Sequence, residues 1–167
     1  MATNPPKPCP ESIITLRPEA PQDEPLLFEL YASTRQDELA ITGWDSAARM
    51  AFLNLQFKAM RQSYRSMFPL AQFSLILANG NAVGRVVVNR TLDEIHVVDL
   101  VVSPAQRCRG IGATVIKALI QEAALARKPV RLQVLKNSRA IRFYQRLGFS
   151  RINETDIYQQ MECLKPD

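Results

Sequence analysis

The sequence has few of the residues that build a disulfide framework or a zinc site, and no stretch that could span a membrane. Its 167 residues include three cysteines, Cys9, Cys108 and Cys163, which are widely spaced and show no partnering pattern. An odd number of such cysteines argues against disulfides and zinc and suits a reduced cytoplasm. No apolar run approaches the ~20 residues that a membrane span requires. We therefore expect a cytoplasmic protein that does not use a membrane.

The N-terminal stretch lacks the apolar core of a signal peptide. Residues 1–11 are rich in proline, and we expect them to form a disordered leader. Residues 12–167 have the usual size of one domain, and the composition, 47% hydrophobic and 22% charged, is ordinary for a globular protein. We expect a single domain with a sizeable core.

A strand, a glycine-containing turn and a helix follow one another between Glu94 and Arg127. In the turn, Gly110 and Gly112 lack a Cβ, so a ligand can approach the backbone N–H groups closely. Arg107 and Arg109 add positive charge beside them. Because free N–H groups and the helix dipole at a helix start bind phosphate, the turn indicates a pyrophosphate site. The alternative is an ordinary strand-to-helix connection with solvated arginines.

Two familiar nucleotide loops do not fit this turn. A Walker loop ends in Gly-Lys-Ser or Gly-Lys-Thr, and the dinucleotide fingerprint has three glycines early in a βαβ unit. The turn instead carries R-x-x-G-x-G, entered from Val102 and Pro104. After the next expected strand comes a second pattern, N-x-x-A-x-x-x-Y-x-x-x-G-F, formed by Asn137, Ala140, Tyr144, Gly148 and Phe149.

In this order the two patterns resemble the GNAT superfamily of N-acetyltransferases. The first matches the family's acetyl-CoA pyrophosphate loop, and the second matches the element that follows its fifth strand. The family's commonest loop has glycine where this chain has Cys108, a departure that costs the loop backbone freedom. The resemblance is clear in the second half of the chain and rests on element order alone in the first half.

The resemblance implies an α/β (α+β) fold. Its mixed, mostly antiparallel sheet has about six to seven strands flanked by about four helices. In the family the fourth and fifth strands splay apart, and the pantetheine arm of the cofactor lies in the gap. The patterns along this chain agree in order. They predict a strand at 12–17, helices at 21–34 and from 45 or 46 to 67, a hairpin turning at 79–81, and a final strand at 157–164.

Two local expectations concern the segment before the hairpin. Residues 36–43 are predicted as a loop, and Asp45 or Ser46 as the cap of the following helix. On that helix one face carries a set of residues that we interpret as the stripe facing the core. The set is Phe52, Leu55, Gln56, Ala59, Met60 and Tyr64. The alternative is that Trp44, Phe52 or Tyr64 lines an acceptor pocket, which the family places under its first two helices.

Acetyl transfer to an amine needs a neutral amine, donors that stabilise an oxyanion, and an acid for the departing thiolate. The resemblance implies Tyr144 as the acid; the alternative is a tyrosine packed at the core edge. Asp99 is the candidate base because it lies nearest the expected site, although it could merely pair with an arginine. Glu94, His96 and water-mediated deprotonation remain alternatives. Strict alternation would place Asp99 on the face of Ile95 and Val97, unless a bulge upsets that parity.

The expected cofactor site draws on the fourth strand, the turn and the second pattern. Backbone N–H groups of the strand end would stabilise the oxyanion, and Asn137 would bond the pantetheine or cap its helix, a role that Ser138 could fill instead. The residues are Leu100, Val101, Val102, Arg107, Cys108, Arg109, Gly110, Ile111, Gly112, Ala113, Asn137 and Tyr144. No metal ligand is expected.

Positive charge is concentrated in the half of the chain that carries the two patterns. Residues 1–99 carry nine Lys/Arg against eleven Asp/Glu, whereas residues 100–167 carry twelve against five. A basic surface there could steer the phosphates of CoA or bind nucleic acid, and we favour CoA because no nucleic-acid motif is present. We expect direct transfer from acetyl-CoA to a primary amine of a small molecule or protein. Two alternatives are a non-catalytic acyl-CoA-binding regulator and a basic nucleic-acid-binding protein; a homodimer is left open.

Overall fold

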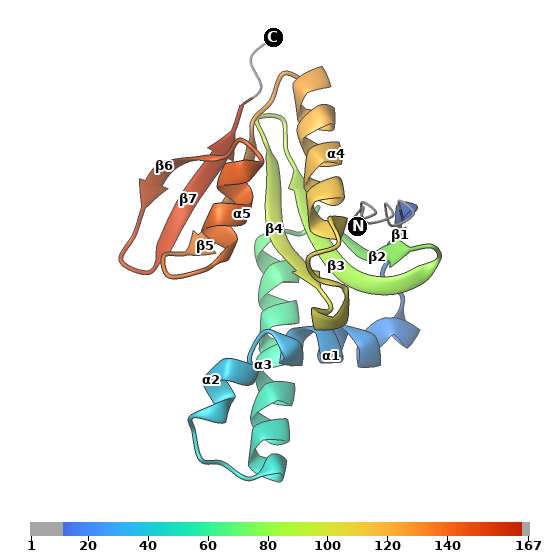
Figure 1. The fold of residues 1–167 in the computed structure, drawn as a ribbon, viewed down its shortest axis with the longest axis vertical. Coiled ribbons are helices and arrows are strands. Elements are labelled where there is room, and N and C mark those ends of the chain that lie inside the picture. Colours follow the sequence, from blue (N-terminus) through green and yellow to red (C-terminus); the bar gives the residue numbers. More distant parts are fainter. Residues whose placement is uncertain (1–11, 165–167) are drawn as a thin grey trace, which may run out of the picture.

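The strands of the computed structural model, which describes residues 12–164, form one sheet in the order β1-β2-β3-β4-β5-β7-β6 (Figure 1). Their bounds are β1 Ile14–Pro18, β2 Gln72–Ala78, β3 Asn81–Arg90, β4 Ile95–Val102, β5 Val130–Leu135, β6 Ser150–Glu154 and β7 Tyr158–Cys163. The helices are α1 Glu24–Ser33, α2 Gln36–Ala40, α3 Ser46–Met67, α4 Ile111–Leu125 and α5 Ala140–Arg146. Short 3-10 turns lie at Pro21–Asp23 (η1) and Pro104–Gln106 (η2). The predicted leader at residues 1–11 falls outside the described residues.

The sheet splays where β4 meets β5. These strands pair in parallel over only three residue pairs, from Ile95↔Val130 to Val97↔Leu132. All other pairings among the described strands are antiparallel. Beyond Val97 the β5 side of β4 has no strand partner, so its backbone groups on that edge are open to a ligand. The mixed sheet and the gap that the resemblance implied are both present.

Two apolar clusters cover the two faces of the sheet. On one face α4 contributes Val115, Ile116 and Leu119 to a core shared with β3, β4 and β5. On the other face α1 and α3 contribute Leu27, Phe57 and their neighbours, which pack against Leu75 of β2. Figure 1 shows α4 running alongside β4, while α2 and the first half of α3 extend away from the sheet. The sheet therefore separates α4, the helix that follows the glycine turn, from α1 and α3 on the opposite face.

A β-bulge changes the direction of the side chains along β4. The register runs Val88↔Val97 and then Val87↔Asp99, so Val98 is an extra residue. Before the bulge Ile95 and Val97 are buried in the α4 core; after it, Leu100 and Val102 pack against that core. The parity predicted for Asp99 is therefore wrong. Asp99 faces the α3 side, because the bulge shifts the alternation by one residue.

The same face of β4 carries the only histidine of the chain. The His96 ring lies 5.3 Å, centroid to centroid, from the ring of Phe68, which follows α3 directly. His96 and Asp99 thus face the same side of the sheet. The predicted separation of the two residues onto opposite faces is wrong for the same reason.

Two predictions about the α2–α3 segment are also wrong. Residues 36–40 are helical, because Leu39 is buried against Leu53 and Phe57 and holds this turn in place. On α3, Leu53 and Phe57 are the buried residues, whereas Leu55 is 68% exposed. The buried stripe is offset from the predicted face because only part of α3 contacts the sheet. Met60 and Tyr64 lie at its edge and are half-buried.

Local turn and cap signals gave correct positions. Asn79 and Gly80 have φ values of 51° and 81°, and the hairpin closes with Ala78 opposite Asn81. Asparagine and glycine tolerate such positive φ values, which two-residue hairpin turns require. The Oδ1 atom of Asp45 accepts a hydrogen bond from the backbone N–H of Ala48 at 2.7 Å and caps α3. Interactions between residues close in sequence therefore determine both the position of the hairpin turn and the start of α3.

Candidate active site

The turn between β4 and α4 holds an unusual backbone. Cys108 and Gly110 both have positive φ, 60° and 77°, and Gly110 lies at the N-cap of α4. The helix has no side-chain cap, so no side chain satisfies the N–H groups of its first turn. The Nε of Arg107 donates to the Val102 carbonyl at 3.1 Å and ties the turn to the end of β4. Cys108, Arg109 and Gly110 are exposed, which leaves the turn accessible to an anion.

In the first turn of α4, small residues allow close packing. A Cβ on Gly112 would lie 3.5 Å from the Phe143 ring, an ordinary contact distance, whereas a Cβ on Gly110 would meet nothing within 4 Å. Ile111 is buried in the α4 core, and Gly112 and Ala113 are half-buried. The first turn of α4 is therefore held by the core under Ile111, while the N-terminal end of the helix, at Gly110, remains exposed.

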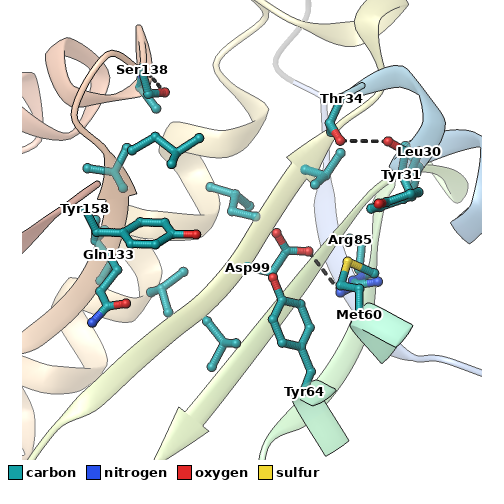
Figure 2. A pocket seen from close by; sticks show the side chains of 18 of the residues that line it. Leu30, Tyr31, Thr34, Met60, Tyr64, Arg85, Asp99, Gln133, Ser138 and Tyr158 are labelled. Atoms are coloured by element: carbon teal, nitrogen blue, oxygen red, sulfur yellow. Dashed lines mark hydrogen bonds and ion pairs between the residues drawn. The ribbon is translucent and has the colours of Figure 1, made fainter. Parts of the chain in front are cut away.

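A cavity of about 750 Å³ occupies the splay and extends under α1 and α3 (Figure 2). Its walls come from both sides of the gap, β4 and β5, and from α1 and α3. Of the predicted site residues, Asp99, Leu100, Val101 and Tyr144 line it. Val102, which packs against the α4 core, does not line the cavity.

Asp99 points into this cavity, and its side chain is 20% exposed. Its Oδ2 lies 3.0 Å from Nη2 of Arg85, a residue of the neighbouring strand β3. Burial raises the pKa of the Asp99 carboxyl, while Arg85 and the backbone N–H of Leu100 oppose that rise. Because its pKa is raised, the Asp99 carboxylate is a better proton acceptor than the carboxylate of an exposed aspartate.

Arg85 was not identified from the sequence. Only 3% of it is exposed, and besides Asp99 it approaches Glu19, with Nε 3.6 Å from Oε1. Arg61 of α3 also approaches Glu19, at 3.7 Å. Nε and Nη2 of Arg85 lack aligned hydrogen-bond partners among the described residues, so these contacts act as charge pairs. A single arginine within the apolar run around Val83–Val88 was the available signal, since a buried charge requires a partner.

Three tyrosines, Tyr64, Tyr144 and Tyr158, line the same cavity as Asp99. In Figure 2 the hydroxyl of Tyr64 points toward Asp99, and Tyr158 reaches into the cavity from the β7 side. Burial raises the pKa of Tyr64 to about 12, and the charge of Asp99 adds to this. Burial and Asp99 likewise raise the pKa of Tyr144, which packs between Phe143 and Phe149. Both hydroxyls therefore stay protonated at neutral pH and can act as donors.

The remaining candidates lie in other places. Glu94 pairs with Arg131 at 2.9 Å and does not line the cavity. His96 lines it, and burial lowers the pKa of its ring. Asn137 is exposed and lies outside the cavity wall, whereas Ser138 lines it. The Oγ of Ser138 accepts from the backbone N–H of Ala140, the first residue of α5, at 3.1 Å, whereas the N-cap itself is Arg139 and makes no side-chain cap.

The described part of the chain holds no group of three or more His, Cys, Asp or Glu side chains arranged to bind a metal ion. Within residues 12–164 no helix has both the length and the apolar character needed to cross a membrane.

The splayed sheet and the uncapped helix after a positive-φ turn define the acyl-CoA N-acyltransferase fold. The sequence model of the Acetyltransferase (GNAT) family matches residues 29–149, and the protein belongs to this family. A comparison with curated proteins found no significant match.

Solved structures share the fold at low sequence identity. The PaiA N-acetyltransferase from Thermoplasma acidophilum, in complex with coenzyme A, is 21% identical, with a TM-score of 0.64 over 92% of this chain and 99% of that one. An acetyltransferase from Thermus thermophilus is 16% identical, with a TM-score of 0.64 over 91% and 97%. The ribosomal-protein-S18-alanine N-acetyltransferase from Escherichia coli is 20% identical, with a TM-score of 0.58 over 91% and 94%.

The family uses acetyl-CoA, and the site fits it. The exposed turn offers positive charge from Arg107 and Arg109 and an uncapped helix start to a pyrophosphate. The open edge of β4 beyond Val97 and the adjoining cavity offer room and backbone groups to an extended pantetheine chain. A β-alanyl and cysteamine chain carries amides, which pair with such free strand edges.

Proposed function

We propose that the protein is an N-acetyltransferase that moves an acetyl group from acetyl-CoA directly to a primary amine of a small molecule or protein. The observation that carries the proposal is one cavity that joins the β4–β5 gap to the carboxyl of Asp99 and the ring of Tyr144. Acetyl-CoA supplies the acetyl group as a reactive thioester. The residues of this chain supply the rest.

Asp99 would accept the proton of the incoming ammonium, directly or through a water. Its location beside Tyr64 and Arg85 fixes its orientation, and its raised pKa makes it a stronger base than an exposed aspartate while Arg85 favours the ionised form. The candidate alternatives fit less well. Glu94 is paired elsewhere, and burial lowers the pKa of His96 and so weakens it as a base.

Tyr144 would hold the proton that the departing thiolate requires. Its raised pKa keeps the hydroxyl protonated, and the neighbouring aromatic rings hold it at the β5 side of the cavity. The backbone N–H of Leu100, on the free edge of β4, would stabilise negative charge on the acyl oxygen, whereas the backbone of Val101 faces β3. Arg107, Arg109 and the start of α4, from Gly110 to Ala113, would hold the pyrophosphate.

Direct transfer agrees with the placement of the described cysteines. Cys108 is exposed on the turn and Cys163 lies in the core, and neither lines the cavity. A covalent acetyl-enzyme would need a nucleophile at the site. We also propose that residues 12–167 act as one domain in the cytoplasm.

An amine-library assay that follows release of free thiol tests the proposal. Turnover with at least one amine, slowed by about 10²–10⁴-fold in Asp99→Asn, is the expected result. Binding of acetyl-CoA without turnover on any amine would favour a non-catalytic acyl-CoA-binding regulator of the same fold. Salt-sensitive DNA or RNA binding that CoA does not compete would favour a nucleic-acid-binding protein.

A further inference from the structure

The charged side chains deep in the acceptor half of the cavity already compensate one another. Arg85 lies 3.0 Å from Asp99 and 3.6 Å from Glu19. Arg61, behind the wall, lies 3.7 Å from the same Glu19. Both Arg85 and the Glu19 side chain are nearly fully buried, so these charges cannot turn toward solvent or toward a ligand without breaking the cluster.

The mouth of the cavity is compensated in the same way. Arg35 and Glu38, at the junction of α1 and α2, form an ion pair at 2.9 Å, and both line the cavity. Burial lowers the pKa of His96, so this further lining residue is neutral at physiological pH. Among the described side chains that line the cavity, both carboxylates, Glu38 and Asp99, therefore have a guanidinium partner, and both guanidiniums, Arg35 and Arg85, have a carboxylate.

Two of the tyrosine rings on the α1 and α3 side of the cavity already lie against an arginine. The guanidinium carbon of Arg85 lies 5.8 Å from the ring centroid of Tyr64. The guanidinium carbon of Arg35 lies 5.7 Å from the ring centroid of Tyr31. A second ammonium group at either ring would meet a fixed positive charge, because each ring already stacks with an arginine.

Between these paired charges the wall is apolar. Beside the tyrosines, the residues that α1, α3 and the position directly after α3 contribute are hydrophobic: Leu27, Leu30, Met60, Met67 and Phe68. Such a wall favours hydrocarbon and aromatic groups, because it offers them dispersion contact and removes them from water.

We propose that the acceptor is a monoamine whose body, beyond the reacting nitrogen, is uncharged and largely apolar, and that the site selects against polyamines and amino acids. The inference rests on the proposed function of the same cavity. A second ammonium would need a free carboxylate, and an acceptor carboxylate would need a free guanidinium. Either group would lose water without gaining a charged partner among the described side chains that line the cavity, which is costly.

Three six-carbon amines of similar basicity test this directly: hexylamine, 1,6-diaminohexane and 6-aminohexanoic acid. They share the reacting amine and chain and differ only at the far end, which is a methyl, an ammonium or a carboxylate. At neutral pH and saturating acetyl-CoA, we expect kcat/KM for hexylamine to exceed both others by about 10-fold or more. Because the symmetrical diamine has two equivalent reacting amines, its kcat/KM is divided by two before the comparison.

A reciprocal pair of variants at the mouth tests the role of charge pairing. Arg35→Gln leaves Glu38 without its partner and should raise the diamine-to-hexylamine ratio of kcat/KM by about threefold to fivefold. Glu38→Gln leaves Arg35 without its partner and should raise the 6-aminohexanoate-to-hexylamine ratio by a similar factor. Both side chains are substantially exposed, so the fold should tolerate the changes. Added salt should reduce both effects.

The outcomes separate the inference from the proposed function. A higher kcat/KM for the diamine or for 6-aminohexanoate than for hexylamine overturns the inference and leaves the N-acetyltransferase proposal intact. Equal ratios in both variants and the parent would also contradict it. Binding of acetyl-CoA with no transfer to any of the three amines would instead overturn the proposed function, and the inference with it.

Discussion

Arg85 and Asp99 lie side by side on neighbouring strands, with Nη2 of the guanidinium 3.0 Å from Oδ2 of the carboxylate. The bulge at Val98 makes this contact, because without the extra residue Asp99 would face the α4 core. Burial raises the pKa of Asp99 and the guanidinium opposes that rise. The pair therefore sets the pH at which the candidate base is ready to accept a proton.

Replacing Arg85 should move the acidic limb of the pH–rate profile. In Arg85→Met the opposing charge is gone, so the pKa of Asp99 rises further and the limb of kcat/KM shifts to higher pH. Arg85→Lys keeps a positive charge and should shift the limb less. Acetyl-CoA affinity, measured by calorimetry, is the control, since Arg85 lies on the face of the sheet away from α4. An unchanged limb in the methionine variant, with the fold intact, would contradict this role.

Asp99→Asn should separate activity from stability. As loss of a general base, the change should lower kcat by about 10²–10⁴-fold. Because the folded protein holds the Asp99 proton more tightly than the unfolded chain does, the stability linked to it is present below the ordinary aspartate pKa. That contribution is lost as pH rises through the raised pKa.

Thermal unfolding of parent and Asp99→Asn across this pH range measures the linkage. The amide cannot ionise, so the variant should lack the loss of stability on raising pH that Asp99 contributes to the parent. A difference in melting temperature that does not change with pH would show that Asp99 does not titrate abnormally.

Tyr144→Phe should leave acetyl-CoA binding near normal and slow turnover by about 10²–10⁴-fold, because only the donor hydroxyl is removed. Tyr31→Phe is the matched control, since it removes a hydroxyl from the opposite wall of the cavity. Steady-state kinetics with the best amine compare the two. Equal rates for Tyr144→Phe and the parent would exclude Tyr144 from proton transfer.

Gly110→Asp should abolish cofactor binding. At φ 77° a Cβ meets nothing nearby, so the damage would come from a negative charge at the helix start and beside the ligand. Gly110→Asn is the matched control, because asparagine tolerates positive φ and has the same shape without the charge. Calorimetry should show at least about 100-fold weaker acetyl-CoA binding for aspartate than for asparagine. Similar affinities would refute the assignment of the turn to the pyrophosphate.

Cys108→Gly should stabilise the protein modestly. Cys108 holds φ 60°, a conformation that costs an L-residue about 1–2 kcal/mol and glycine nothing. The extra freedom of glycine in the unfolded chain offsets part of this, leaving a net gain of up to about 1 kcal/mol. Cys108→Ala, which keeps the unfavourable φ, should show no such gain. Urea unfolding of the three proteins gives the comparison.

Much of the fold could be predicted because local chemistry and the two patterns specified it. Asn79-Gly80 fixed the hairpin, Asp45 fixed the start of α3, and the order of elements followed the resemblance. The α2 helix was missed because five residues carry too little periodicity, and the packing of Leu39 determines it. The face of α3 was missed because the sequence does not reveal which turns reach the sheet.

The candidate site was predictable where it depends on backbone and motif, and not where it depends on contacts between distant segments. Tyr144 was implied by the resemblance to the family, and the turn residues by their glycines, their arginines and the same resemblance. The bulge at Val98 leaves no local mark in an apolar run, so the side to which Asp99 points could not be fixed. Arg85 and Glu19, 66 positions apart, meet only in the folded chain.

The three residue pairs between β4 and β5 form a short seam that divides the sheet into two parts. Few backbone hydrogen bonds hold the smaller part, β5-β7-β6, to the larger part. We therefore expect the two parts to separate locally at a low free energy. A ligand bound across the gap would contact both parts of the sheet and would oppose their local separation. Amide hydrogen exchange in β5, β7 and β6 would therefore report occupancy of the gap even when no chemistry occurs.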